Sequence, residues 1–188
     1  MALSAGLMWA LIIGGVLLFF LVIYIFTLIN RFVRYSNAID NAWAQIDVQL
    51  QRRGELIPNL VEAVKGYAKH ERELFENVSK ARAGMMSAKT PEAKMQASGI
   101  LDQMVGRLFA VAEAYPELKA NTNFLQLQDE LSHTENKVSF ARQNYNDSVL
   151  RYNNAIQTFP ARFFAGGRTA RQMLAAPEGS KAVPKVAF

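Results

Sequence analysis

The sequence predicts an all-α protein: an N-terminal transmembrane helix followed by an antiparallel, up-and-down bundle of about four helices, with long helices. Three observations support this prediction. Residues 7–29 contain no charged side chain. Beyond them, apolar residues recur every three or four positions, which is the period of a helix that buries one face, and strand-like alternation is almost absent. The breaks between periodic runs contain proline or clustered asparagines.

We expect three segments: a transmembrane anchor over residues 1–30, a helical bundle over 31–160 and an irregular C-terminal tail over 161–188. Residues 31–160 carry 16 Lys and Arg against 15 Asp and Glu, and the residues after Pro160 carry 5 against 1. A nucleic-acid interface needs a basic stripe on the folded surface, so no nucleic-acid partner is expected. The chain has no cysteine, which excludes disulfides and thiolate metal sites.

The apolar N-terminal segment has the length of a membrane span. Its 23 residues rise about 1.5 Å each, which covers roughly the 30 Å of a bilayer core. A secretory signal carries a basic region before its apolar core, whereas no Lys or Arg precedes this one, so an uncleaved single-pass anchor is predicted. Arg31 and Arg34 follow at once, which predicts the N-terminus outside and the body in the cytoplasm, with a periplasmic body as the alternative.

Small residues recur every four positions within the predicted anchor, at Gly6, Ala10 and Gly14. Such a stripe lets two membrane helices approach closely, so these residues are predicted to pack against another helix. The alternative is that Gly and Ala are simply common in membrane helices.

The body contains four runs of helical spacing. The first runs from Phe32 to Ile46, the second from Ile57 to Met85, the third from Ala93 to Val111 and the fourth from Phe124 to Phe159. The second and fourth are long enough to describe helices that lie along one another at a shallow angle. The predicted bundle or oligomer seam contains Trp43, Ile46, Pro58, Glu71, Phe124, Leu127, Leu131, Thr134, Tyr145 and Tyr152.

The segment 52–64 places a proline between two apolar stretches. Gly54 is suited to end a helix, Arg52 and Arg53 complement the negative end of the preceding helix dipole, and Pro58 is tolerated in the first turn of a new helix. These features predict a corner or sharp kink. A gentler kink within one long helix is the alternative, because no good N-cap residue stands just before Pro58.

The other breaks have clearer signals. Thr90 is expected to cap a helix that starts at Pro91, with Glu92 in its first turn. The segment 121–123, Asn-Thr-Asn, offers caps for the last long helix.

Residue types that carry catalysis are scarce. Glu130 and His133 have the Glu-x-x-His spacing of bundle di-iron proteins, but those sites need a second such motif, and His70 has Tyr67 three residues before it. His70-Glu71 would need a second histidine at position 74 for a zinc-protease motif, and Leu74 stands there. We therefore expect no enzyme, no cofactor, no metal and no small-molecule substrate.

Polar residues on the predicted seams have two readings. Glu71, Thr134 and Ser148 occupy seam positions, and Asn146 and Asn153 follow the seam tyrosines seven residues apart. Polar groups at a helix interface can specify register or oligomer state at a cost in stability. The alternative is that these positions lie at a bundle edge and contact water.

Several blocks of the sequence resemble the LemA family of bacterial membrane proteins. These are Ala42–Arg53, Leu56–Glu62, Val64–Glu71, Asn123–Gln128, Glu130–Lys137, Ala141–Asp147 and Tyr152–Pro160. The resemblance covers about residues 1–165 and returns in the last residues, whereas the segment 167–174 departs from the family pattern. It implies a single N-terminal membrane helix with its N-terminus outside and an antiparallel bundle without known catalytic residues.

The functional expectation is a non-enzymatic scaffold that oligomerises or recruits partners at the bacterial inner membrane, in envelope organisation or membrane shaping. Its expected partners are the lipid bilayer, further copies of the chain and other proteins. One alternative is an adaptor that binds a protein through its tail, and a less favoured one is a metal-dependent enzyme in the bundle core. The candidate tail contacts, to a protein or to the membrane surface, are Arg162, Arg168, Arg171, Lys185 and Phe188.

Overall fold

The structure is a computed structural model that describes residues 4–175. Its elements are α1 (Ala5–Lys65), α2 (Arg72–Ser87), α3 (Pro91–Ala112), α4 (Pro116–Lys119), α5 (Thr122–Gln157) and the 3-10 helix η1 (Ala161–Phe164). Residues 4–175 contain no strand. The predicted all-α class and the long N-terminal apolar helix are therefore confirmed.

The chain divides into two compact units. Of the described residues, unit 1 contains 4–40 and 147–173, and unit 2 contains 41–146 with 174 and 175. The helices α1 and α5 contribute residues to both units. The expected division into anchor, bundle and tail was based on composition and sequence pattern, and it stays a prediction.

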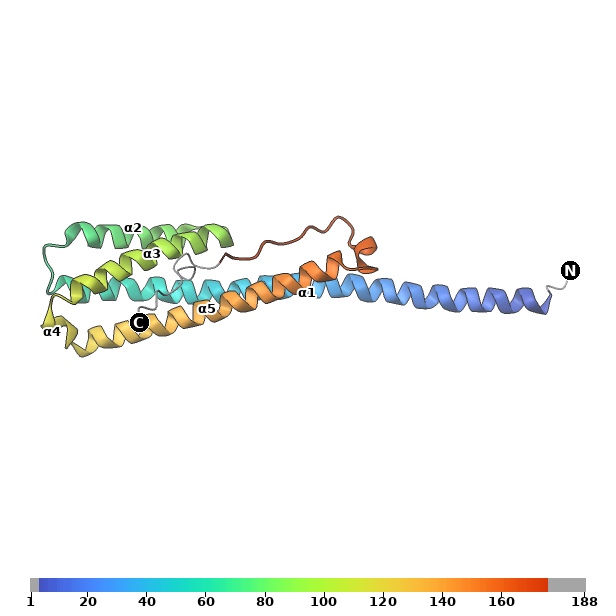
Figure 1. The fold of residues 1–188 in the computed structure, drawn as a ribbon, viewed down its shortest axis with the longest axis horizontal. Helices are drawn as coiled ribbons and strands as arrows, with labels where there is room; N and C mark the ends of the chain where they lie inside the picture. Colours follow the sequence, from blue (N-terminus) through green and yellow to red (C-terminus); the bar gives the residue numbers. More distant parts are fainter. Residues whose placement is uncertain (1–3, 176–188) are drawn as a thin grey trace, which may run out of the picture. The chain divides into compact units, whose positions relative to one another are not determined.

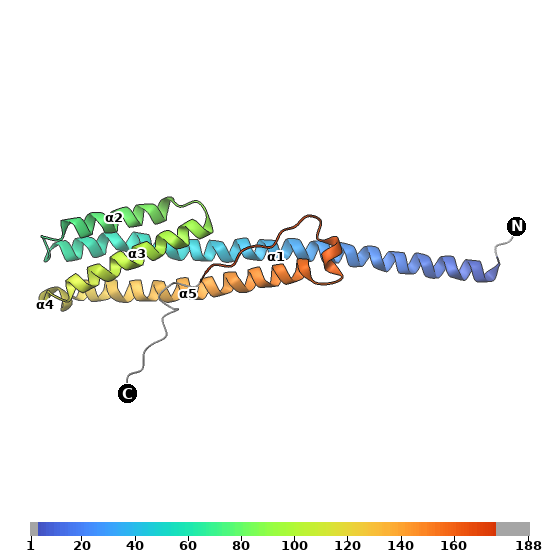
Figure 2. The ribbon, with the colours of Figure 1, turned by 45° about the horizontal axis from the view of Figure 1, so that its top comes forward.

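Unit 2 is an up-and-down four-helix bundle. The C-terminal part of α1, α2, α3 and the first part of α5 lie along one another, and each runs opposite to the one before it (Figures 1 and 2). The core is built from the apolar face of each helix, because burying these stripes is the main favourable term in folding. Its fully buried side chains include Ile46, Leu50, Ile57, Leu60, Val64, Val78, Met85, Leu101 and Leu108.

Unit 1 contains the first part of α1, the last part of α5, η1 and the segment that follows it. Leu28, Phe32 and Ile39 of α1 are buried here. The α5 residues Val149, Tyr152 and Ile156 and the small residues Ala161 and Ala165 are buried as well. The expected irregular tail thus begins with one turn of 3-10 helix, and residues 165–175 have no regular structure.

The predicted corner at Pro58 is wrong. Helix α1 continues through Pro58 to Lys65, and the side chain of Pro58 is exposed. A proline inside a helix removes the N–H that would bond to the carbonyl four residues earlier, which here is Gly54. That carbonyl instead accepts a hydrogen bond from Arg82 Nε of α2. The helix tolerates Pro58 because a side chain from a neighbouring helix replaces the lost donor.

Gly54 has a packing role in place of the predicted helix-terminating one. A Cβ at this position would lie 2.7 Å from Sδ of Met86 and 3.3 Å from Cε of Met85. Glycine therefore allows the two methionines of α2 to approach α1 closely, and the neighbouring carbonyl comes within reach of Arg82.

The long second run, from Ile57 to Met85, does not form one helix. Helix α1 ends at Lys65, next to Gly66, and α2 begins at Arg72. The run is interrupted where Gly66 weakens the helix, because glycine is about 1 kcal/mol less favourable than alanine in a helix interior. Glu71, placed on a continuous seam by its spacing, is instead the N-cap residue of α2 and makes no side-chain cap hydrogen bond.

The other helix starts are as predicted. Oγ1 of Thr90 accepts a hydrogen bond of 3.2 Å from the backbone N of Ala93, and Pro91 opens α3. Oδ1 of Asn121 accepts from the backbone N of Asn123 at 2.9 Å and of Phe124 at 3.2 Å. Both caps satisfy N–H groups that have no partner within the helix.

Candidate functional site

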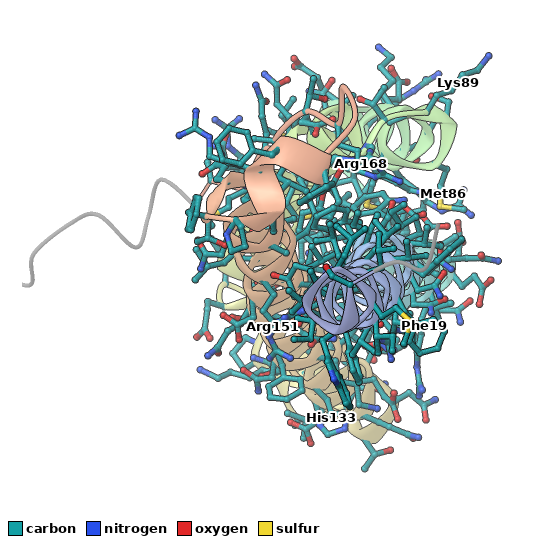
Figure 3. The ribbon with its side chains drawn as sticks, turned by 90° about the vertical axis from the view of Figure 1, so that its right-hand side faces the viewer. Phe19, Met86, Lys89, His133, Arg151 and Arg168 are labelled. Atoms are coloured by element: carbon teal, nitrogen blue, oxygen red, sulfur yellow. The ribbon has the colours of Figure 1, made fainter. Side chains whose placement is uncertain are left out.

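The apolar first part of α1 is long enough to cross a membrane, by length and composition. Its large side chains are exposed, and Phe19 is an example (Figure 3). An exposed apolar surface of this size on a folded chain marks a contact with lipid or with another apolar surface. The predicted stripe of Gly6, Ala10 and Gly14 is exposed too, and the space where a Cβ would stand at Gly6 or Gly14 is open to 4 Å.

A buried arginine ties three helices of unit 2 together. The side chain of Arg53 on α1 is only 5% exposed. Its Nη1 donates to Oδ1 of Asp102 at 2.5 Å and to Oγ of Ser98 at 3.2 Å, both on α3. Its Nη2 pairs with Glu135 of α5. A buried cation needs such partners, because an unpaired charge is very costly inside a protein.

Burial perturbs the pKa values of this cluster. Loss of water around Asp102 raises the pKa of its carboxyl, and the attraction of Arg53 and Arg142 opposes that rise. Desolvation likewise lowers the pKa of Arg53, against the attraction of Asp102. Desolvation also lowers the pKa of Arg142. The cluster resembles a structural crosslink: its donors and acceptors are directed at one another across α1, α3 and α5.

Two further ion pairs, one of them partly buried, connect helices of unit 2. Nη2 of Arg52 lies 2.8 Å from Oε2 of Glu130, and Lys94 pairs with Asp47. Glu130 is therefore engaged by Arg52. Residues 4–175 contain no group of three or more His, Cys, Asp or Glu side chains that could hold a metal ion.

The predicted seam residues of the bundle mostly point inward. Ile46, Phe124, Leu131, Tyr145 and Tyr152 are buried, and Trp43 and Leu127 are half-buried. The Trp43 and Tyr145 rings meet edge to face at 6.3 Å. The buried Thr134 donates its hydroxyl to the carbonyl of Glu130 in the preceding turn, at 2.7 Å. Their role in an oligomer seam stays a prediction.

An open groove of about 550 Å³ lies on unit 2 between α1 and α5. Val48 and Phe140 contribute apolar surface to its walls, with His133 and Lys137 along the α5 side. Phe140 is 75% exposed. The amide oxygen of Gln49, another lining residue, is buried without a hydrogen-bond partner in the described part of the chain.

Two asparagines of α5 hold the segment after η1. Asn153 and the backbone of Arg171 exchange two hydrogen bonds of 2.9 Å in unit 1. Asn146 and the backbone of Leu174 make the same pair in unit 2, at 3.1 and 2.9 Å.

The tail arginines are not equivalent. The guanidinium of Arg168 lies 5.3 Å from the ring centre of the buried Phe32, and its Nη1 donates to the carbonyl of Ala165. Arg162 lies 6.0 Å from the ring centre of Phe163. Figure 3 labels Arg168 together with Arg151 of α5. Lys185 and Phe188, also predicted as tail contacts, lie outside the described residues.

Sequence reasoning missed the two sets of arginines that the structure assembles. Arg53 was assigned to a helix end, although its position among apolar neighbours of the α1 stripe is a signal of burial. Arg31, Arg34 and Arg151 belong to the same unit, and the sequence signal for this grouping was weaker. Residues 148–173 contain four arginines and no acidic residue.

Comparisons with known proteins place the chain among related sequences. The model of the LemA family matches residues 42–188. Protein LemA of Metamycoplasma hominis is 28% identical over 152 residues, which cover 77% of this chain and 68% of that protein. Magnetosome protein MamQ of Magnetospirillum gryphiswaldense is 25% identical over 174 residues, which cover 77% of this chain and 64% of that protein. Magnetosome protein MamQ 2 of Paramagnetospirillum magneticum is 25% identical, with 72% and 60% covered.

The fold and these surfaces define a class: an all-helical protein with a candidate membrane span in its first helix. The chain belongs to the LemA family. It spans less than two thirds of the length of the magnetosome relatives.

Proposed function

We propose that this protein is a non-enzymatic helical scaffold, anchored in the bacterial inner membrane by the first part of α1. The observation that carries the proposal is the exposed apolar surface of α1 before Arg31, which has no covering partner in the described part of the chain. Transfer of such a surface from water into lipid is favourable by about 25 cal/mol per Å².

Extraction of bacterial membranes tests the anchor. The full chain is expected in the membrane pellet after alkaline carbonate and urea washes, because its apolar segment stays in lipid. A variant that lacks residues 1–30 is expected in the wash. Recovery of the intact full chain in the wash would overturn the proposal.

We propose the cytoplasm as the side of unit 2, in keeping with the positive-inside rule. The chain has no native cysteine, so single cysteines give clean labelling with a membrane-impermeant maleimide. In intact spheroplasts, Ser4→Cys should react and Lys89→Cys should not. The reverse pattern would place unit 2 in the periplasm.

The scaffold role includes self-association through the groove between α1 and α5. The exposed ring of Phe140 suits a second copy of this chain that brings an apolar helix face. In mild detergent, light scattering should give the mass of an oligomer for the natural chain and a smaller mass for Phe140→Glu. Leu125→Glu, an exposed apolar position of α5 outside the groove, is the control and should stay oligomeric.

An adaptor role for the tail is a second candidate. Leu174 and Ala175, the last described residues, are held by Asn146 and Arg142 of α5 on unit 2. Crosslinking in cells should capture fewer proteins when residues 176–188 are removed. An unchanged set of crosslinked proteins would eliminate this candidate.

A further inference from the structure

Unit 1 collects positive charge that its own residues do not neutralise. Its described residues include six arginines and two aspartates, and the aspartates are Asp40 and Asp147 at its boundary with unit 2. None of these arginines forms an ion pair with a carboxylate among residues 4–175. Unpaired cations of this density attract anions from outside the chain.

A small pocket lies among these arginines. It has a volume of about 240 Å³ and is lined on one side by Leu28, Arg31 and Tyr35 of α1 and on the other by Arg151, Asn154 and Thr158 of α5. No lining residue is acidic. Its volume falls below the roughly 300 Å³ at which pockets for drug-sized ligands begin. The pocket therefore suits a compact anionic group, such as a phosphate, more than a whole small molecule.

The position of Arg31 at the pocket is supported by a neighbour. Its Nε donates to the hydroxyl of Tyr35 at 3.0 Å, and its guanidinium lies 5.3 Å from the centre of the Tyr35 ring. The remaining N–H groups of the guanidinium are available to an oxygen ligand, and arginine matches the planar geometry of phosphate oxygens.

The pocket lies at the level where the apolar segment ends. Leu28 is a lining residue, and the first charge of the chain, Arg31, is another. A span that starts near residue 7 and rises about 1.5 Å per residue passes out of a 30 Å hydrocarbon core close to residue 27. Lipid phosphates lie just outside that core, at the height of Arg31.

Two exposed aromatic rings stand beside the pocket. Phe159 and Phe163 are 79% and 73% exposed, and their rings meet edge to face at 6.0 Å. They flank Ala161, which lines the pocket together with Leu28. Exposed aromatic side chains next to basic residues are typical of segments that insert into the boundary between headgroups and acyl chains.

These observations point to one ligand class. We infer that unit 1 binds the phosphate of an anionic phospholipid through Arg31 and Arg151, with Phe159 and Phe163 inserted into the same leaflet. The inference depends on the membrane anchor proposed above and adds to it a preference for the lipid headgroup.

Native mass spectrometry of the full chain in detergent tests the headgroup preference. With added phosphatidylglycerol the natural protein should retain bound lipid at concentrations at least tenfold lower than with phosphatidylcholine. The double variant Arg31→Gln, Arg151→Gln should lose this preference. A natural chain that binds both lipids equally would overturn the inference.

A charge-matched control distinguishes a specific phosphate site from general electrostatic attraction by the arginines of unit 1. The double variant Arg34→Gln, Arg171→Gln removes the same charge from unit 1 but leaves the pocket lining intact, and it should keep the preference within threefold. Equal losses in both double variants would overturn the site. A third arm uses inorganic phosphate: effective competition at the lipid concentration would assign the pocket to a free anion and overturn the lipid assignment.

Spin labelling tests insertion without removing an arginine. Phe159→Cys, labelled in the full chain in anionic vesicles, should be accessible to oxygen and protected from a water-soluble nickel complex. Lys89→Cys in unit 2 should show the reverse, and similar behaviour at both positions would overturn insertion. A natural chain extracted from membranes by carbonate refutes the anchor, whereas a retained chain with no lipid preference refutes only this inference.

Discussion

In unit 2 several charged side chains form ion pairs between helices, whereas in unit 1 the arginines have no carboxylate partner among residues 4–175. Arg53 is buried and contacts Asp102, Ser98 and Glu135, but Arg31 contacts the ring and hydroxyl of Tyr35 and forms no ion pair among residues 4–175. Arginine therefore has a different role in each unit. In unit 2 arginine connects helices, and in unit 1 it is available to an external anion.

The largest test of this contrast is the removal of one arginine from each unit. Arg53→Ala should lower the free energy of unfolding by about 3 kcal/mol, because it removes the charged hydrogen bonds to Asp102 and Ser98 and the packing of a buried side chain. Arg34→Ala in unit 1 should change it by less than about 0.5 kcal/mol, as expected of an exposed side chain. Urea titration of the full chain in detergent, followed by circular dichroism, measures both.

The neighbouring Arg52 supplies the matched control. Its pair with Glu130 is half exposed, and such pairs contribute about 0.2–1 kcal/mol. Arg52→Ala should therefore cost much less than Arg53→Ala. Equal costs at the two positions would show that burial does not set the difference between them.

The next effect concerns the proline inside α1. Arg82→Ala should lower the free energy of unfolding by about 1.5 kcal/mol, because the carbonyl of Gly54 loses a donor with a charged group. In the Pro58→Ala background the same change should cost less, since the new backbone N–H bonds to that carbonyl. A double-mutant cycle measures this coupling, and strictly additive costs would contradict the assigned role of Arg82.

A smaller effect is expected from pH. Burial raises the pKa of Asp102 above its usual value of 3.8, so the folded state binds a proton more readily than the unfolded state at this carboxyl. The stability of the natural chain relative to Asp102→Asn should then rise as pH falls toward the raised pKa, and decrease as pH rises through it. Urea titrations between neutral and mildly acidic pH measure the difference, and the opposite slope would mean that attraction by Arg53 outweighs desolvation.

The smallest global effect is expected at the tail. Asn153→Ala removes two hydrogen bonds to the exposed Arg171 backbone and should lower the free energy of unfolding by less than about 1 kcal/mol. Local opening should nevertheless increase, and hydrogen exchange at residues 168–173 should become faster. Asn154→Ala, on the adjacent position of α5, is the control and should leave that exchange unchanged.

The sequence by itself determined the apolar segment, the helical class and the two helix starts at Thr90 and Asn121, because these depend on composition, period and short-range hydrogen bonds. It misplaced the first break. Gly54 and Pro58 have the local chemistry of a helix end, but their effect depends on whether a neighbouring helix supplies a donor, and Arg82 is 28 residues away along the chain.

Only the tertiary structure decided which charges meet. Arg53 acquires partners 45, 49 and 82 residues further along the chain, and Arg31 shares a pocket with Arg151. Period and composition report the face of a helix that is buried, but not which residues of another helix stand opposite. That pairing is set by the packing of whole helices, which is why the charges that distinguish the two units became visible only in the folded chain.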